Sequence, residues 1–133
     1  MISGGGTNMQ ALMDATAKGE IDAEIVGVVS SSDSAYGNQR AENAGLPVKV
    51  VVRKNFDTAE SFNAANLAAI SSFNPDGVIL AGYLAMIGPE IITQFKNRII
   101  NIPPSLIPSF CGKGYYGHKV QRGGLDYGAK LSG

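Results

Sequence analysis

Short apolar runs alternate with helix-like patterns along the whole chain. The apolar runs are rich in β-branched residues and predict buried strands over residues 23–30, 48–52, 77–81 and 98–102. Apolar residues at helical spacing predict helices over residues 7–18, 36–44, 58–73 and 89–95. Short apolar strands separated by helices are typical of a parallel sheet covered on both faces. The pattern therefore predicts an α/β fold with a doubly wound, mostly parallel sheet.

Capping residues support these helix boundaries. Gly19 and Gly45 follow the first two predicted helices, Thr58 precedes the third, and Pro89 takes a favourable first position in the fourth. The sequence contains no internal repeat and no low-complexity tract, and 133 residues suit one hydrophobic core. We therefore expect residues 1–133 to form a single domain.

The strand pattern is incomplete at both ends. Only Met1, Ile2 and Ser3 precede a glycine-rich segment that should end a first strand, and strands usually have about five or six residues. Residues 129–133 begin what resembles another strand. The pattern therefore predicts a domain that is truncated at both termini, with apolar sheet surface left exposed.

The glycine-rich segment Ser3-Gly4-Gly5-Gly6-Thr7-Asn8 leads directly into the first predicted helix. Glycines allow close approach of backbone N–H groups to a ligand, and a helix start adds unpaired donors and a positive dipole end. We therefore expect a phosphate site at Gly5, Gly6, Thr7 and Asn8. The spacing matches neither a Walker A loop nor Gly-x-Gly-x-x-Gly. The alternative is a tight turn in which Thr7 or Asn8 caps the helix.

Composition adds few constraints. Lysine plus arginine and aspartate plus glutamate number 11 each, so bulk attraction to nucleic acid or an anionic membrane is not expected. The single cysteine, Cys111, has no partner for a disulfide and no neighbours at metal-ligand spacing. No metal site is expected. Without a signal peptide or a long apolar run, the sequence predicts a cytoplasmic protein.

Two further segments follow predicted strands and should lie at the same edge of the sheet as the glycine-rich segment. The first, Leu80 to Ile87, is either core that continues into a helix or an apolar wall for a flat heterocycle. The second is Asn101-Ile102-Pro103-Pro104-Ser105-Leu106-Ile107-Pro108. A third segment, Gly112-Lys113-Gly114-Tyr115-Tyr116-Gly117, is either a loop that closes over a ligand or an ordinary exposed loop.

The segment that begins at Asn101 resembles the signature Asn-Ile-His-Pro-Ser-Leu-Leu-Pro of the phosphoribosylglycinamide formyltransferases, folate-dependent enzymes of purine synthesis. Three other segments match this family in the same order and spacing: residues 3–8, 80–83 and 112–117. The resemblance covers essentially the whole chain, and the family extends before Met1 and past Gly133. It implies a Rossmann-like formyltransferase fold and formyl transfer from 10-formyltetrahydrofolate, as co-substrate, to glycinamide ribonucleotide.

The resemblance also implies roles for individual residues. The phosphate of the ribonucleotide would bind at Gly6, Thr7 and Asn8, in agreement with the interpretation from the residues alone. The ribose and glycinamide would contact Gly82, Ile102 and Pro104. The pterin would lie beside Leu84, Ala85, Met86 and Ile87. Asn101 would stabilise the oxyanion that forms when the amine attacks the formyl carbon.

The chain departs from the family at Pro103, which takes the place of the family's histidine. Proline has no titratable group and no N–H, so it cannot carry a proton. The family's catalytic aspartate falls beyond position 133. The only histidine, His118, is better explained as an exposed or helix-start residue than as a replacement.

Three interpretations follow from these matches. The first is a formyltransferase whose activity in this chain is in doubt. The second is a non-catalytic protein that binds a sugar phosphate or folate. The third is an unrelated small nucleotide-binding α/β module.

Overall fold

The structure of the protein is a computed structural model, and it describes residues 1–102. Its elements, in chain order, are α1 (Thr7–Ala17), β1 (Val28–Ser30), α2 (Tyr36–Asn43), β2 (Val48–Val50), a short 3-10 helix η1 (Arg53–Asn55), α3 (Ala59–Ser72), β3 (Val78–Ala81), α4 (Pro89–Gln94) and β4 (Ile99–Ile102). The predictions made for Pro103, Pro104, Cys111, His118 and residues 112–117 lie outside the described residues.

The predicted order of strands and helices is confirmed, with one strand much shorter than expected. The sequence predicts a strand from residue 23, whereas β1 begins at Val28. Ala23, Glu24 and Val26 are exposed, and β1 pairs with β2 only over three residues, so the preceding apolar residues have no strand beside them. The helix η1 was not predicted, because its residues Arg53-Lys54-Asn55 carry no apolar pattern.

The ends of the helices agree with the capping prediction. Thr58 caps α3, and its side-chain oxygen accepts a hydrogen bond from the Ser61 N–H at 3.1 Å. Gly45, just after α2, has a φ of 80°, which glycine adopts without strain. Pro89 lies in the first turn of α4, as expected.

Residues Met1 and Ile2 join two pairs of parallel strands. β1 pairs with β2 and β3 pairs with β4, both in parallel. Ile2 forms a parallel bridge with Ser30, and its N–H donates to the Val29 carbonyl at 3.0 Å. On the other side, the Ala81 N–H donates to the Met1 carbonyl at 2.9 Å. The order across the molecule is therefore β2, β1, residues 1–2, β3 and β4, as in a doubly wound α/β fold.

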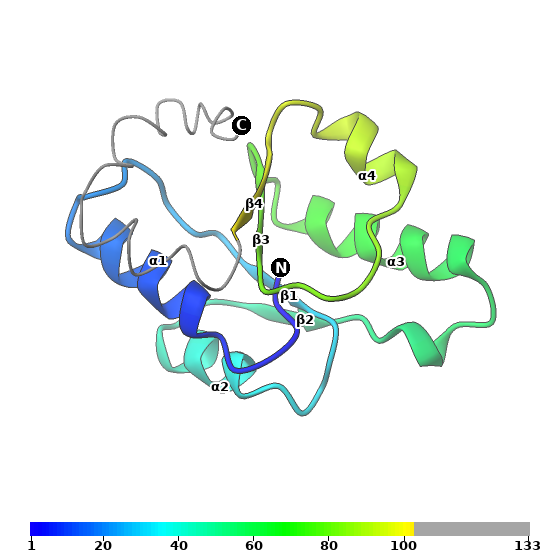
Figure 1. The fold of residues 1–133 in the computed structure, drawn as a ribbon, viewed down its shortest axis with the longest axis horizontal. Coiled ribbons are helices and arrows are strands. Elements are labelled where there is room, and N and C mark those ends of the chain that lie inside the picture. Colours follow the sequence, from blue (N-terminus) through cyan, green and yellow to red (C-terminus); the bar gives the residue numbers. More distant parts are fainter. Residues whose placement is uncertain (103–133) are drawn as a thin grey trace.

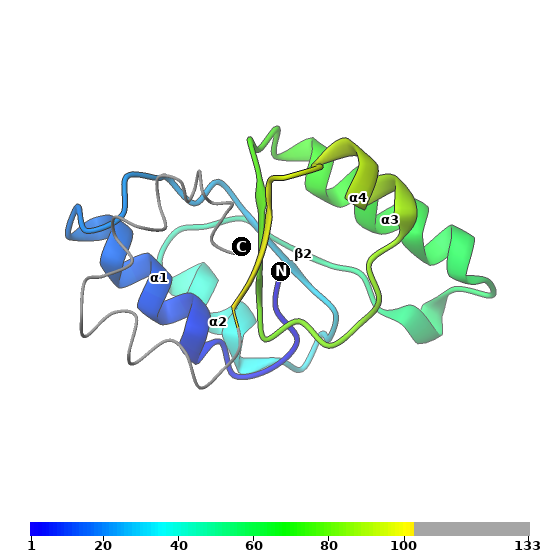
Figure 2. The ribbon, with the colours of Figure 1, turned by 45° about the horizontal axis from the view of Figure 1, so that its top comes forward.

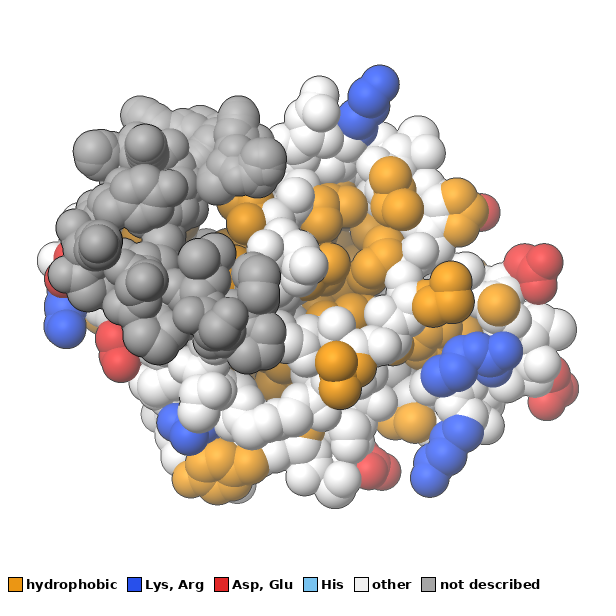
Figure 3. Space-filling view, in the orientation of Figure 1, with side chains coloured by type: hydrophobic (Ala, Val, Ile, Leu, Met, Phe, Trp, Pro, Cys, Tyr) orange, Lys and Arg blue, Asp and Glu red, His pale blue; other side chains and the backbone are white. Residues whose placement is uncertain are grey.

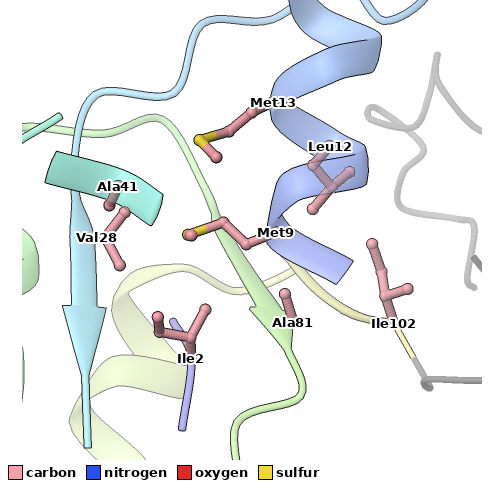
Figure 4. Packing of buried hydrophobic residues seen from close by; sticks show 8 residues of the cluster. All are labelled: Ile2, Met9, Leu12, Met13, Val28, Ala41, Ala81 and Ile102. Atoms are coloured by element: carbon pink, nitrogen blue, oxygen red, sulfur yellow. The ribbon is translucent and has the colours of Figure 1, made fainter. Parts of the chain in front are cut away.

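Helices cover both faces of this sheet. In both Figure 1 and Figure 2, α1 and α2 lie on one side of the strands, and α3 and α4 lie on the other. Each side has its own buried cluster. In the first cluster, Met9 and Met13 extend from α1 toward Val28 and Ala41, and Leu12 lies toward Ile102 (Figure 4). None of the helices within residues 1–102 is long and apolar enough to cross a membrane.

A buried asparagine lies in the α3 side of the molecule. Asn66 is fully buried, and its Nδ2 donates to the Tyr83 hydroxyl at 3.1 Å. The Asn66 Oδ1 has no hydrogen-bond partner among the described residues. Burial raises the pKa of the Tyr83 phenol above its ordinary value, and the hydrogen bond from Asn66 acts in the opposite direction. The pair ties α3 to the segment that follows β3.

The nitrogen of Met1 lies between the two strand pairs and donates to the Ile79 carbonyl at 2.7 Å, which adds to the pairing of residues 1–2 with β3.

We expect Tyr83→Phe to lower the free energy of unfolding by about 1–3 kcal/mol, because it leaves the buried Asn66 amide without a partner. Adding Asn66→Leu should recover most of this loss, since both polar partners are then replaced by apolar groups. Tyr36→Phe, at an exposed tyrosine, is the matched control and should change stability by less than about 0.5 kcal/mol. A double variant no more stable than Tyr83→Phe would refute this account.

Candidate functional site

The hydroxyl of Ser3 links three loops at the carboxyl edge of the sheet. Ser3 follows residues 1–2, Ser31 follows β1, and Leu84 lies in the loop after β3. The Ser3 and Ser31 hydroxyl oxygens are 2.6 Å apart, and the Leu84 N–H donates to Ser3 Oγ at 2.8 Å. Ligands of open α/β sheets bind at this edge. The structure therefore brings the glycine-rich segment and the loop after β3 together.

The glycine-rich segment forms a sharp corner before α1. Gly6 is the residue before the helix and has a φ of 80°, and no side chain caps the helix. The alternative was a tight turn with Thr7 or Asn8 as the cap; the tight turn is present, but the residue at the cap position is Gly6. A residue without Cβ adopts this φ freely, which explains why glycine takes the cap position instead of a residue with a capping side chain.

Backbone N–H groups at this corner are available to a ligand. The first helical hydrogen bond runs from the Gln10 N–H to the Gly6 carbonyl, at 2.8 Å. Among residues 1–102, no acceptor receives the N–H groups of Gly5, Gly6, Thr7 or Asn8. Gly5 and Thr7 are exposed, and Asn8 is buried. Unpaired donors at a helix start, together with its dipole, favour an anion.

Helix α2 packs against this corner, a contact that the sequence pattern does not predict. The Gly37 N–H donates to the Gly4 carbonyl at 3.0 Å, and Arg40 Nε donates to the Gly5 carbonyl at 2.8 Å. The signal that could have pointed to it is Gly37 itself. Glycine in a helix lowers its stability, so its presence in the first turn indicates a close backbone contact.

The apolar residues of the loop after β3 differ in how exposed they are. Leu84 and Met86 have exposed fractions of 87% and 79%, whereas Ala85 and Ile87 pack against the α3 side of the core. The loop begins at Gly82, with a φ of 73°, and is not helical, so the interpretation as core leading into a helix is wrong for Leu84 and Met86. Hydrophobic side chains gather around the middle of the face shown in Figure 3.

The end of β4 lies beside the end of β3. Asn101 pairs with Leu80, and Ile102 pairs with Ala81, one residue before Gly82. The Asn101 residue is exposed and Ile102 is buried, as their alternation along a strand requires. Asn101 is therefore at the same edge as Gly82 and Leu84. Within residues 1–102, no group of His, Cys, Asp and Glu side chains is arranged to hold a metal ion.

Comparisons with known proteins agree on one family. Residues 1–133 match the sequence profile of the formyl transferase family. The chain is 38% identical over 133 residues to a chloroplastic phosphoribosylglycinamide formyltransferase of Vigna unguiculata, covering 99% of this chain and 42% of that protein. It is 37% identical over 131 residues to the phosphoribosylglycinamide formyltransferase of Haemophilus influenzae, covering 98% of this chain and 62% of that protein. The chain thus spans only part of the length of these relatives.

Solved structures show the same fold. The phosphoribosylglycinamide formyltransferase of Brucella melitensis superposes with a TM-score of 0.73 at 42% identity, over 96% of this chain and 64% of that one. Glycinamide ribonucleotide transformylase 1 of Symbiobacterium toebii gives a TM-score of 0.73 at 35% identity, over 90% of this chain and 58% of that one. The order of elements, the carboxyl-edge site and the match over the whole chain agree, and the chain belongs to the formyl transferase family.

Proposed function

We propose that the protein binds glycinamide ribonucleotide and 10-formyltetrahydrofolate, and that its chemistry is formyl transfer between them. The observation that supports this most is the convergence at one sheet edge of unpaired N–H donors, an exposed apolar loop and Asn101. The proposed partners are thus small molecules. A cytoplasmic location stays a prediction, because the Vigna unguiculata relative is named as chloroplastic.

The ribonucleotide phosphate is proposed to bind at Gly5, Gly6, Thr7 and Asn8. A phosphate accepts several hydrogen bonds at once, and consecutive unpaired N–H groups at a helix start supply them together with a favourable dipole. The protein has no net charge to attract an anion from a distance, so these local donors must supply the affinity.

The folate is proposed to lie along residues 84–87. Leu84 and Met86 present apolar surface to a flat ring, and Ala85 and Ile87 anchor the loop in the core behind it. Gly82, just after β3, and Ile102, at the end of β4, are proposed as neighbours of the ribose and glycinamide. Pro104, proposed for the same role, lies outside the described residues.

Asn101 is proposed to assist the reaction itself. The neutral amine nitrogen attacks the formyl carbon and a tetrahedral oxyanion forms. The bond between this carbon and N10 of the folate then breaks, and the net result is that the amine loses one proton and N10 gains one. An amide N–H aimed at the oxyanion stabilises it more than the ground state. Asn101 is exposed at the end of β4, where an amide can reach a bound ligand.

Pro103 leaves proton transfer without a carrier at the family's histidine position. This residue supports a second candidate function, a protein that binds a sugar phosphate or folate without turnover. The third interpretation, an unrelated nucleotide-binding module, is excluded by membership of the formyl transferase family. The two remaining functions share the binding sites and differ only in rate.

Titration with glycinamide ribonucleotide should shift the amide NMR signals of Gly5, Gly6, Thr7 and Asn8. Inorganic phosphate should shift the same signals with weaker affinity, because it lacks the contacts of the ribose and glycinamide. Signals from the opposite edge of the sheet, such as Gly77, provide the internal control. If these four signals do not move while others do, the phosphate lies elsewhere.

Formyl transfer by the chain with Pro103 should be slow, and Pro103→His should accelerate it more than Pro103→Ala. General acid–base groups contribute roughly 10²–10⁴-fold, and we expect the acceleration by histidine to lie in this range. The alanine variant removes the proline without adding a proton carrier. Conversion of 10-formyltetrahydrofolate to tetrahydrofolate, followed by absorbance, gives the rate. Equal rates for the three chains would contradict the role given to position 103.

A further inference from the structure

We propose that Arg40 and Gly37 of α2 are positioning residues that orient the N–H groups of Gly5 and Gly6 toward the bound phosphate. The proposal rests on the proposed phosphate site. It adds the helix α2, whose role is to hold the glycine corner rather than to bind the phosphate itself. Its basis is a pair of hydrogen bonds to consecutive carbonyls of the glycine corner.

These two bonds fix neighbouring peptide groups from the same side. The Gly37 N–H, in the first turn of α2, donates to the Gly4 carbonyl at 3.0 Å. Arg40 Nε, one turn further along the same helix, donates to the Gly5 carbonyl at 2.8 Å. The Gly37 donor has no partner within its own helix because it lies in the first turn, so the contact uses a group that needs an acceptor.

Peptide geometry converts these contacts into an orientation of donors. In a trans peptide group the carbonyl and the N–H of the next residue point in opposite directions. The structure has no cis peptide bond among residues 1–102. With the Gly4 and Gly5 carbonyls held toward α2, the N–H groups of Gly5 and Gly6 therefore point away from α2. Two consecutive donors then face the side from which a ligand approaches.

The close approach of the two segments requires glycine on both sides. A Cβ at Gly37 would come within 2.5 Å of Ile2 Cδ1 and 3.0 Å of the Gly4 oxygen, and a Cβ at Gly6 would come within 2.7 Å of Gly37 Cα. Gly6 and Gly37 thus allow the backbones to meet, and the hydrogen bonds hold them together. A merely flexible glycine loop needs neither feature.

The Arg40 side chain is itself held in place. Its guanidinium lies 5.1 Å from the centre of the Tyr36 ring, and Nη1 donates to Gln10 Oε1 at 3.4 Å. These contacts come from α2 and α1, on either side of the corner. A planar guanidinium suits several partners at fixed angles, whereas a lysine ammonium keeps the charge without this geometry.

The test compares Arg40→Gln and Arg40→Lys with Arg98→Gln as matched control. Arg98 also donates to a backbone carbonyl, that of Gln94, but it lies before β4, at the amino edge of the sheet. Glycinamide ribonucleotide binding by calorimetry should weaken about tenfold in Arg40→Gln and remain unchanged in Arg98→Gln. Folate binding should change less than twofold in all variants. Arg40→Lys should fall between the parent and Arg40→Gln, because it keeps only the charge.

Residual dipolar couplings of the Gly5 and Gly6 N–H bonds in the ligand-free proteins provide a readout of orientation alone. We expect them to change in Arg40→Gln and to stay as in the parent in Arg98→Gln. Unchanged couplings in Arg40→Gln, or full ribonucleotide affinity in Arg40→Lys, would overturn the positioning role. A parent that binds no ribonucleotide, with the couplings changed as expected, would instead refute the proposed function.

Discussion

Everything at the carboxyl edge depends on the position of Met1 and Ile2 between β1 and β3. Their backbone hydrogen bonds to Val29 on one side and to Ala81 on the other make one sheet of two strand pairs. Ile2 is buried and packs against α2 at Gly37, where a Cβ would leave no room for the Ile2 side chain. The chain then leaves the sheet at Ser3, so the glycine corner begins at the edge where ligands of such folds bind.

Few polar side chains lie at the candidate site, and the positions of its loops depend on hydrogen bonds from the neighbouring elements. Ser3 ties the loops after residues 1–2, β1 and β3 to one another through a single hydroxyl. Asn66 holds the loop after β3 from α3, through Tyr83, and α2 holds the glycine corner. Only the Asn66 amide is fully buried, so losing its partner is costly, whereas the bonds made by Arg40 and by the Leu84 N–H are exposed. A site of this kind depends on positions that do not contact the ligand.

The sequence was sufficient for the fold class and for the segments that form the carboxyl edge. Apolar periodicity located all the main helices and strands because each buries one face or stripe. It placed the start of β1 too early, because Ala23 to Gly27 are apolar enough for a strand yet have no neighbouring strand. Gly37 signals a close backbone contact, but the sequence does not show that Arg40 bonds to the Gly5 carbonyl. This hydrogen bond joins residues 35 positions apart and depends on how α2 packs, which apolar periodicity does not reveal. The burial of Asn66 could not be predicted either, because asparagine is usually exposed.

The family match favours formyl transfer, whereas proline at position 103 argues against proton transfer at that position. In the proposed function, the glycine corner and the loop after β3 hold the two substrates, while proline at position 103 supplies no proton carrier. Binding and catalysis are separable in this proposal, and its central part is binding at the glycine corner. A crystal structure of the complex with glycinamide ribonucleotide tests it directly. We predict phosphate oxygens within hydrogen-bond distance of the Gly5, Gly6, Thr7 and Asn8 N–H groups, with Arg40 Nε still donating to the Gly5 carbonyl. A phosphate bound away from this corner would contradict it.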